Sequence, residues 1–225
     1  MRLKDKNTIL WENNHDFDSL VSIMSILRGD GGCPWDREQT HESIRKCLIE
    51  ETYEVVEAID TDDAELMREE LGDLIFQAVF HSQIENEKGN FTVDDVISDI
   101  CKKMIRRHPH VFGQAEADTS DVVSLNWDEI KKTENKGSKN CVISAPPHLP
   151  ALIKAQKIQG KARKRLGIGF ASKADAINYA SEHIEDIPKA IFALTAAAEF
   201  EGMDAEKALN DIIRIFSEHC QMKNK

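Results

Sequence analysis

Residues 50–73 read EETYEVVEAIDTDDAELMREELGD, and this stretch decides the fold that the sequence predicts. It contains eleven acidic residues and a single Arg, so it carries nearly all of the net charge of −11 of the 225-residue chain. On both sides of it, apolar residues recur at helical spacing, and runs of alternating β-branched residues are nearly absent. We therefore predict an all-α protein, a helical bundle with a smaller helical C-terminal domain, whose acidity is concentrated in one place.

Two long helices are predicted on either side of a tight acidic turn. The first covers about residues 40–59 and the second about residues 64–87. Asp62 and Glu65 have the spacing of a capping box at the start of the second helix. Because so few residues separate the two helices, they should form an antiparallel hairpin. Further helices are expected at about residues 16–28, 92–107, 151–166, 173–183 and 186–220, the last with a turn near Gly202.

The chain divides into a head and a tail. From Thr133 to Pro150 the sequence reads TENKGSKNCVISAPPHLP, which is typical of a linker. We therefore expect a domain at residues 1–133, a linker at 134–150 and a second helical domain at 151–225.

Composition excludes several classes of protein. With 41% hydrophobic and 31% charged residues, the chain can form a core without disulfides, and its five scattered cysteines predict neither a disulfide framework nor a zinc site. No segment approaches the roughly 20 apolar residues of a membrane span, and the N-terminal sequence lacks the apolar run of a signal peptide. A cytoplasmic location is the expectation.

Carboxylates recur at helical spacing on both arms of the predicted hairpin. Glu50, Glu51 and Glu54 share one face of the first helix, and Glu70 and Asp73, three residues apart, share a face of the second. Converging carboxylates repel one another unless a cation binds, and oxygen ligands without His or Cys favour Mg²⁺ or Mn²⁺. Mg²⁺ typically binds few carboxylates together with substrate phosphates, so a phosphate ester or anhydride is the expected substrate.

An acidic helix face that is merely solvated is the alternative, since Glu is a good helix former. Against it, Glu70 and Asp73 are interleaved with Leu71, Leu74 and Ile75, at a border with the core where an unpaired charge is costly.

The segments EETYEVVEAI and REELGDLIFQ together resemble the MazG nucleotide pyrophosphohydrolases, whose signature is EExxE followed by ExxD. GCPWDREQT before them and RRHPHVFG after them also resemble this family, so that the resemblance covers about residues 17–135. LPALIKAQKIQ, at residues 149–159, resembles the start of the second domain in two-domain members. The resemblance implies an all-α fold, Mg²⁺-dependent hydrolysis of a nucleoside triphosphate to the monophosphate and pyrophosphate, and a helical homodimer.

The resemblance also implies roles for individual residues. Four acids match the family's metal ligands: Glu51, Glu54, Glu70 and Asp73. Glu50 and Glu51 are the catalytic candidates, because Glu50 is adjacent to the metal ligands and could hold or deprotonate the attacking water. Lys103 and Arg107, with Arg106 beside them, match the stretch that contacts phosphates, and Trp127 matches a position that borders the nucleobase. Trp35 could line the same mouth as Trp127 or anchor its own loop, and the structural role is the expectation. For His81, His108 and His110 we also expect structural roles.

The tail departs from the two-domain pattern. Its acids Glu182, Glu185 and Asp186 are not followed by an ExxD motif, and Pro188 and Lys189 stand where the GD of that motif is expected. We therefore predict a degenerate second domain without a metal site. A basic helix at 151–166 could bind nucleic acid, but a solvated or packing surface is the simpler interpretation, so neither nucleic acid nor membrane is expected as a partner.

Three functions remain open. The leading hypothesis is a pyrophosphohydrolase that clears unwanted nucleotides from the pool. The second is a catalytically silent regulatory protein that binds nucleotides, and the third is a narrower enzyme that acts on deoxynucleotides.

Overall fold

The computed structural model describes residues 3–11, 14–115, 119, 122, 123, 127, 130, 134 and 143–223. Residues 133 and 135–142, which include much of the expected linker, lie outside the described residues. Every regular element in the described part is a helix, which confirms the all-α class. Contacts divide the chain into two units, residues 1–130 and 131–225, and each is described by itself. None of the described helices has the length and apolar character that crossing a membrane requires.

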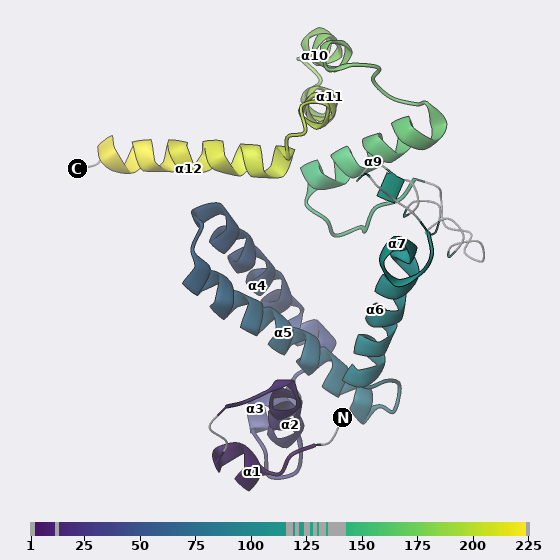
Figure 1. Ribbon diagram of the computed structural model, residues 1–225. Coiled ribbons are helices and arrows are strands. Elements are labelled where there is room, and N and C mark those ends of the chain that lie inside the picture. Colours follow the sequence, from purple (N-terminus) through teal and green to yellow (C-terminus); the bar gives the residue numbers. More distant parts are fainter. Residues whose placement is uncertain are drawn as a thin grey trace. The chain divides into compact units, whose positions relative to one another are not determined.

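Unit 1 is built around a long antiparallel hairpin of α4 and α5 (Figure 1). The predicted helices at 16–28, 40–59, 64–87 and 92–107 are present, with ends shifted by one or two residues. Three short helices were not predicted, because four to six residues are too few to reveal a period. The helices of this unit are α1 (Lys6–Trp11), α2 (Phe17–Arg28), α3 (Pro34–Glu38), α4 (His41–Thr61), α5 (Ala64–Glu87), α6 (Val93–Arg107) and α7 (Pro109–Phe112).

The turn of the hairpin differs by one residue from the prediction. Asp62 ends α4 in the left-handed conformation, with φ of 54°, and the side chain of Asp63 accepts hydrogen bonds from the backbone amides of Glu65 and Leu66. The predicted capping box of Asp62 with Glu65 is therefore wrong. The chain reverses at Asp62, whose short polar side chain tolerates the left-handed region, and this leaves Asp63 as the cap.

The core of unit 1 fixes α5 between its neighbours. Met24 of α2, Ile44 of α4 and Phe80 of α5 are all nearly inaccessible to solvent and belong to one apolar cluster. Arg28, at the end of α2, pairs with the Glu87 carboxylate at 2.8 Å and also donates to the backbone carbonyls of Asp36 and Gln39. These contacts hold α2, α3 and the C-terminal end of α5 together, which keeps the hairpin in place.

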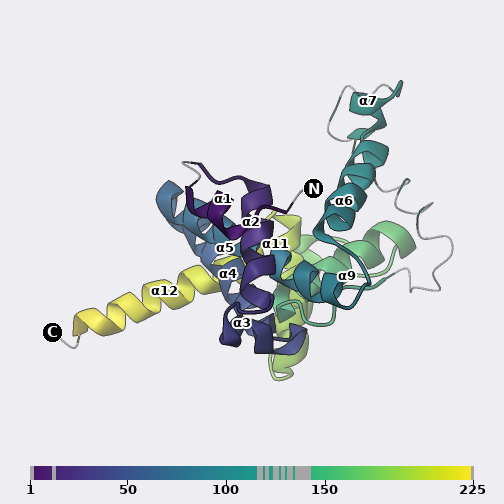
Figure 2. The same ribbon diagram turned by 90° about the horizontal axis from the view of Figure 1, so that it is seen from below.

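Helix α6 begins at the Thr92 cap and leads away from the hairpin, as both ribbon views show (Figures 1 and 2). Among the described helices, it contacts α5 and α7. The side chains of Val96, Ile97 and Ile100 are consequently exposed. This face of α6 is apolar and has no covering element among the described residues of unit 1.

Unit 2 is a smaller helical unit with a core of small residues. Ala176 of α10 and Ala196 and Ala197 of α11 form one buried cluster, on which Phe170 packs. The predicted helix at 186–220 is divided by a turn containing Gly202, which has φ of 69°, so the expected interruption is present. The helices are α9 (Ala151–Leu166), α10 (Lys173–Glu182), α11 (Ile187–Phe200) and α12 (Ala205–Lys223).

Candidate metal centre

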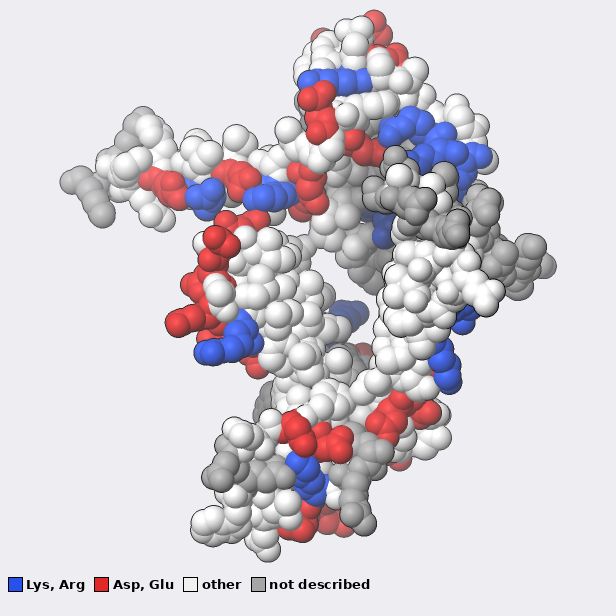
Figure 3. Space-filling model, in the orientation of Figure 1, with Lys and Arg blue, Asp and Glu red and all other residues white. Residues whose placement is uncertain are grey.

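Three predicted metal ligands meet across the hairpin. Glu51 of α4 and Glu70 and Asp73 of α5 each offer one carboxylate oxygen, and these oxygens lie within 4.8 Å of one another. Glu54 of α4 lies near enough to raise the pKa of both Glu51 and Glu70, so the fourth predicted ligand stands beside this group. In the space-filling view, acidic side chains gather at the outer end of this hairpin, near the turn between α4 and α5 (Figure 3). The three- and four-residue spacings put these carboxylates on facing sides of two helices, and the short turn sets the register.

The cluster is electrostatically unfavourable as it stands. Burial raises the pKa of Glu51, and the neighbouring carboxyl groups of Glu54 and Asp73 raise it further. Burial likewise raises the pKa of Glu70, which is only 8% exposed, with Glu54 and Asp73 as the next contributors. The main influences on both groups are desolvation and other carboxylates, which disfavour the ionised form. A cation bound at this point would attract each carboxylate and could outweigh both the desolvation and the repulsion.

The donor set determines which cations fit. The group of Glu51, Glu70 and Asp73 contains carboxylate oxygens only, with neither histidine nor cysteine. Hard divalent cations such as Mg²⁺ and Mn²⁺ prefer this chemistry, whereas zinc and copper sites usually include nitrogen or sulfur. The residues present therefore fit the metal that the sequence implies.

Glu50 lies to one side of this cluster. Its side chain is 49% exposed and pairs with Lys46 Nζ at 3.0 Å, one turn earlier on α4. Glu50 is adjacent in sequence to Glu51 but on the neighbouring track of the helix, which turns it towards solvent.

The predicted phosphate-binding residues lie on α6, away from the acids. Lys103 and Arg107 are half-buried and Arg106 is exposed. Because α6 diverges from the hairpin (Figure 1), the described part of unit 1 does not bring these cations among the carboxylates. Arg107 does meet Trp127, with its guanidinium carbon 5.2 Å from the centre of the indole ring, a cation–π contact. One of the residues predicted for the phosphates, Arg107, thus lies next to the residue predicted for the base.

Two other aromatic predictions have different outcomes. The His108 ring lies edge-on to Trp127 at 5.0 Å, and its Nδ1 bonds to the carbonyl of Met104 at the end of α6, in keeping with a structural role. Trp35 is 60% exposed, so its ring does not anchor the GCPWD loop in a core.

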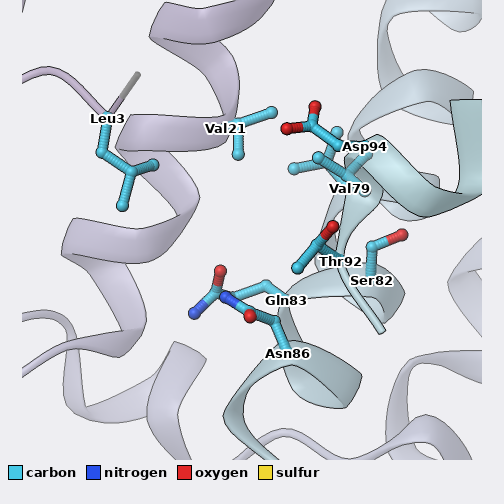
Figure 4. Close-up of a pocket in the computed structure, with 9 residues that line it drawn as sticks. Leu3, Val21, Val79, Ser82, Gln83, Asn86, Thr92 and Asp94 are labelled. Atoms are coloured by element: carbon cyan, nitrogen blue, oxygen red, sulfur yellow. The ribbon is translucent and has the colours of Figure 1, made fainter. Parts of the chain in front are cut away.

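A cavity of about 170 Å³ lies elsewhere in unit 1 (Figure 4). Val21 and Val79 line its apolar side, and Asn86, Thr92 and Asp94 are among its polar lining. It is formed by α2, α5 and the start of α6, and none of the predicted site residues lines it. The cavity is therefore not the candidate centre.

Two polar features of the hairpin were missed from the sequence. His41 and His81 stack, with their Nδ1 atoms 2.7 Å apart, and His41 Nε2 lies 2.6 Å from the Glu85 carboxylate. Gln77, four residues after Asp73, is 7% exposed. The register of the antiparallel hairpin could have indicated both features. If Glu51 faces Asp73, residue 41 must face the region of residues 81–85. Residue 77 lies on the same face of α5 as Glu70 and Asp73.

The protein is thus all-α, and a group of carboxylates from both helices of its hairpin forms a centre suited to a hard divalent cation. Comparison with known proteins gives the family. Residues 39–112 match the model of the MazG nucleotide pyrophosphohydrolase domain, and this segment contains the whole acidic cluster.

Three relatives extend the comparison. A nucleoside triphosphate pyrophosphohydrolase/pyrophosphatase MazG of Thermotoga maritima is 39% identical over 216 residues, which covers 90% of this chain and 83% of the relative. The nucleoside triphosphate pyrophosphohydrolase of Escherichia coli K12 is 40% identical over 176 residues, covering 77% of this chain and 66% of that enzyme. An uncharacterized protein of Bacillus subtilis, YabN, is 49% identical over 146 residues, but this match covers only 30% of its length and 64% of this chain. The chain belongs to the MazG family of metal-dependent nucleotide pyrophosphohydrolases.

Proposed function

We propose that this chain hydrolyses nucleoside triphosphates to nucleoside monophosphates and pyrophosphate with Mg²⁺, and thereby clears unwanted nucleotides from the pool. The observation that carries the proposal is the convergence of Glu51, Glu70 and Asp73 on one point of the α4–α5 hairpin. Membership of the MazG family supports the reaction, because relatives from Thermotoga maritima and Escherichia coli are named for it.

Each residue has a proposed task. Glu51, Glu54, Glu70 and Asp73 would hold the cation, with Mn²⁺ as a possible substitute, and the bound cation would neutralise charge on the phosphates. Glu50, at the solvent side of these ligands, would orient or deprotonate the attacking water, with Glu51 next to it. The basic residues of α6 would bind the polyphosphate: Lys103, Arg106 and Arg107. Trp127, held against Arg107, would border the nucleobase.

We also propose a homodimer. The family resemblance implies one, and unit 1 leaves apolar side chains exposed on both the hairpin and α6, among them Ile49, Tyr53, Ile97 and Ile100. A second copy of the chain could cover these faces. Light scattering measures the molar mass in solution. We expect the wild-type protein to be a dimer, Ile97→Glu to dissociate it, and the control Asp99→Asn on the same helix to leave it intact. A monomeric wild-type protein would refute the dimer.

The reaction itself is tested by product analysis. A panel of ribo- and deoxynucleoside triphosphates is incubated with and without Mg²⁺, and monophosphate plus pyrophosphate is separated from diphosphate plus phosphate. We expect Mg²⁺-dependent monophosphate and pyrophosphate from the wild-type protein, and loss of turnover in Glu51→Gln and Asp73→Asn while their helical circular dichroism is retained. Trp127→Ala should raise KM more than it lowers kcat.

The other outcomes of this assay have definite meanings. Activity confined to deoxynucleotides would identify the narrower enzyme. Nucleotide binding without turnover would identify the regulatory protein. Full activity in Glu51→Gln or Asp73→Asn would remove that residue from the metal centre.

A further inference from the structure

Gln77 is a buried polar residue on the acid-bearing face of α5. The residue is 7% exposed, and its amide oxygen is buried and has no hydrogen-bond partner among the described residues. Neighbouring positions of the same helix that face inward, such as Phe80 and Ile84, are apolar and belong to the core. A buried amide oxygen without a donor lowers the stability of a fold, so its presence calls for a physical reason.

The position of Gln77 points to the acidic cluster. It follows Asp73 by four residues and Glu70 by seven, which places all three on one face of α5, with a rise of about 6 Å between Asp73 and Gln77. Side chains on a helix lean towards its N-terminus, so the Gln77 amide extends from its own turn towards the turn of Asp73. The residue therefore borders the candidate metal centre on the side that faces the core.

The chemistry of the cluster explains why the oxygen has no partner. Ionised carboxylates accept hydrogen bonds and cannot donate them. Asp73, the acid one turn before Gln77 on this face, could therefore accept a hydrogen bond from the NH₂ end of the amide, but it could not donate one to the amide oxygen. A hydrated divalent cation brings strong donors, because Mg²⁺ typically retains several of its water ligands in protein sites.

We propose that Gln77 is a positioning residue of the metal centre, whose amide oxygen accepts a hydrogen bond from a water molecule bound to the cation. This inference rests on the proposed function of the same cluster. Gln77 would fix the orientation of that water and, through it, the placement of the cation between α4 and α5. Partners of this kind, beyond the direct ligands, commonly change metal affinity by about 10- to 100-fold when they are removed.

A competing explanation is a water molecule held between Gln77 and His81. The Nε2 atom of His81, one turn further along α5, is also buried and has no partner among the described residues. Such a water would make both residues purely structural. Removing the Gln77 amide would then lower the melting temperature and leave metal affinity unchanged.

The two explanations are separated by metal titration of the full-length protein. Binding of Mn²⁺ and of Mg²⁺, without nucleotide, is measured by calorimetry on the wild-type protein, Gln77→Met, Gln77→Glu and Glu70→Gln. Met has nearly the shape of Gln but no hydrogen-bonding groups, whereas Glu keeps an acceptor oxygen at the same place. Gln83→Met is the matched control, because Gln83 lies on the same helix and bonds to Glu87 instead of facing the acids.

We expect Gln77→Met to weaken binding of both metals at least tenfold, with a melting temperature in the absence of metal equal to or above that of the wild-type protein. Gln77→Glu should retain wild-type affinity or exceed it, and Gln83→Met should leave affinity within twofold. Unchanged affinity in Gln77→Met, alongside loss of binding in Glu70→Gln, would overturn the role of Gln77 and leave the metal centre standing. Absence of binding in the wild-type protein, or full binding in Glu70→Gln, would instead overturn the proposed centre itself.

Discussion

Glu70 is the most buried carboxylate of the cluster, and its surroundings oppose its charge. Burial, Glu54 and Asp73 all raise its pKa above the usual value of 4.5. The folded protein therefore retains this proton at a pH at which the unfolded chain has lost it. The contribution of the group to stability is present at low pH and declines as the pH rises from about 4.5 through the raised pKa. Above that window, the ionised cluster destabilises the fold unless a cation is bound.

This leads to a prediction for Glu70→Gln. Without divalent cations at pH 7.5, the variant should melt a few degrees higher than the wild-type protein, because one of the repelling charges is gone. Addition of Mg²⁺ should raise the melting temperature of the wild-type protein and leave that of the variant unchanged. Differential scanning calorimetry with and without Mg²⁺ measures both effects. A variant that melts lower than the wild-type protein in the absence of metal would show that the repulsion is not significant.

The paired histidines give a second prediction, of pH dependence. Burial and the neighbouring His41 lower the pKa of His81 below its usual 6.5, whereas Lys88, Asn90 and His41 lower the pKa of Glu85 to about 2 and keep it ionised. With the two Nδ1 atoms 2.7 Å apart, only one of them can carry a proton, so the pair accommodates one positive charge but not two. Protonation of His81 thus favours the unfolded chain, and stability should fall as the pH drops below about 6.5.

The measurement is the melting temperature between pH 7.5 and pH 5.5. We expect it to decline for the wild-type protein and to decline less steeply for His81→Gln. His219→Gln, on an exposed stretch of α12, is the control and should keep the wild-type slope. Parallel slopes for the wild-type protein and His81→Gln would rule out His81 as the source of the pH dependence.

At the scale of the elements, Arg28 determines how α2, α3 and α5 are joined. Its side chain is only 6% exposed, pairs with Glu87 and satisfies the carbonyl groups of Asp36 and Gln39. Arg28→Met would leave these acceptors without a donor and should reduce the free energy of unfolding by about 2–4 kcal/mol. Denaturant titration measures this value. Arg37→Met, which removes a 48% exposed arginine 3.8 Å from Asp30, should change it by less than about 0.5 kcal/mol, and equal losses in the two variants would contradict the role of Arg28.

The elements that could be predicted are those with their own periodic pattern. The long helices α4 and α5 have several turns of apolar spacing and clear end signals, and the sequence predicted both to within two residues. The short helix α3 has a single turn and depends on Arg28 contacts from α2, which lie outside its own sequence. The predicted cap of α5 was wrong by one residue because either of two adjacent aspartates, Asp62 and Asp63, could act as the cap. The chain reverses at Asp62, and this leaves Asp63 as the cap.

At the scale of the whole molecule, the acids of the two units have different roles. Among the described residues, the group able to hold a metal lies in unit 1, and in unit 2 Asp186 serves as the cap of α11 while Glu182 and Glu185 are exposed. We therefore expect Glu182→Gln and Glu185→Gln to keep kcat within twofold of the wild-type value, in contrast to Asp73→Asn. Steady-state kinetics on the full-length protein gives the comparison. A loss of tenfold or more in either unit 2 variant would place part of the reaction in the second unit.

The sequence by itself determined the helical class, the hairpin and the acids that face one another, because helical spacing and a short turn are local properties that fix which side chains share a face. Only the tertiary structure decided that the Gln77 oxygen lacks a donor, that the facing His41 and His81 stack with their Nδ1 atoms 2.7 Å apart, and that Arg107 lies against Trp127 while α6 leaves the hairpin. The two side-chain pairs join segments 40 and 20 residues apart, and the Gln77 oxygen lacks a donor because of which side chains lose contact with water when the helices pack. The burial of a side chain depends on contacts between distant segments, so a local sequence pattern cannot predict it.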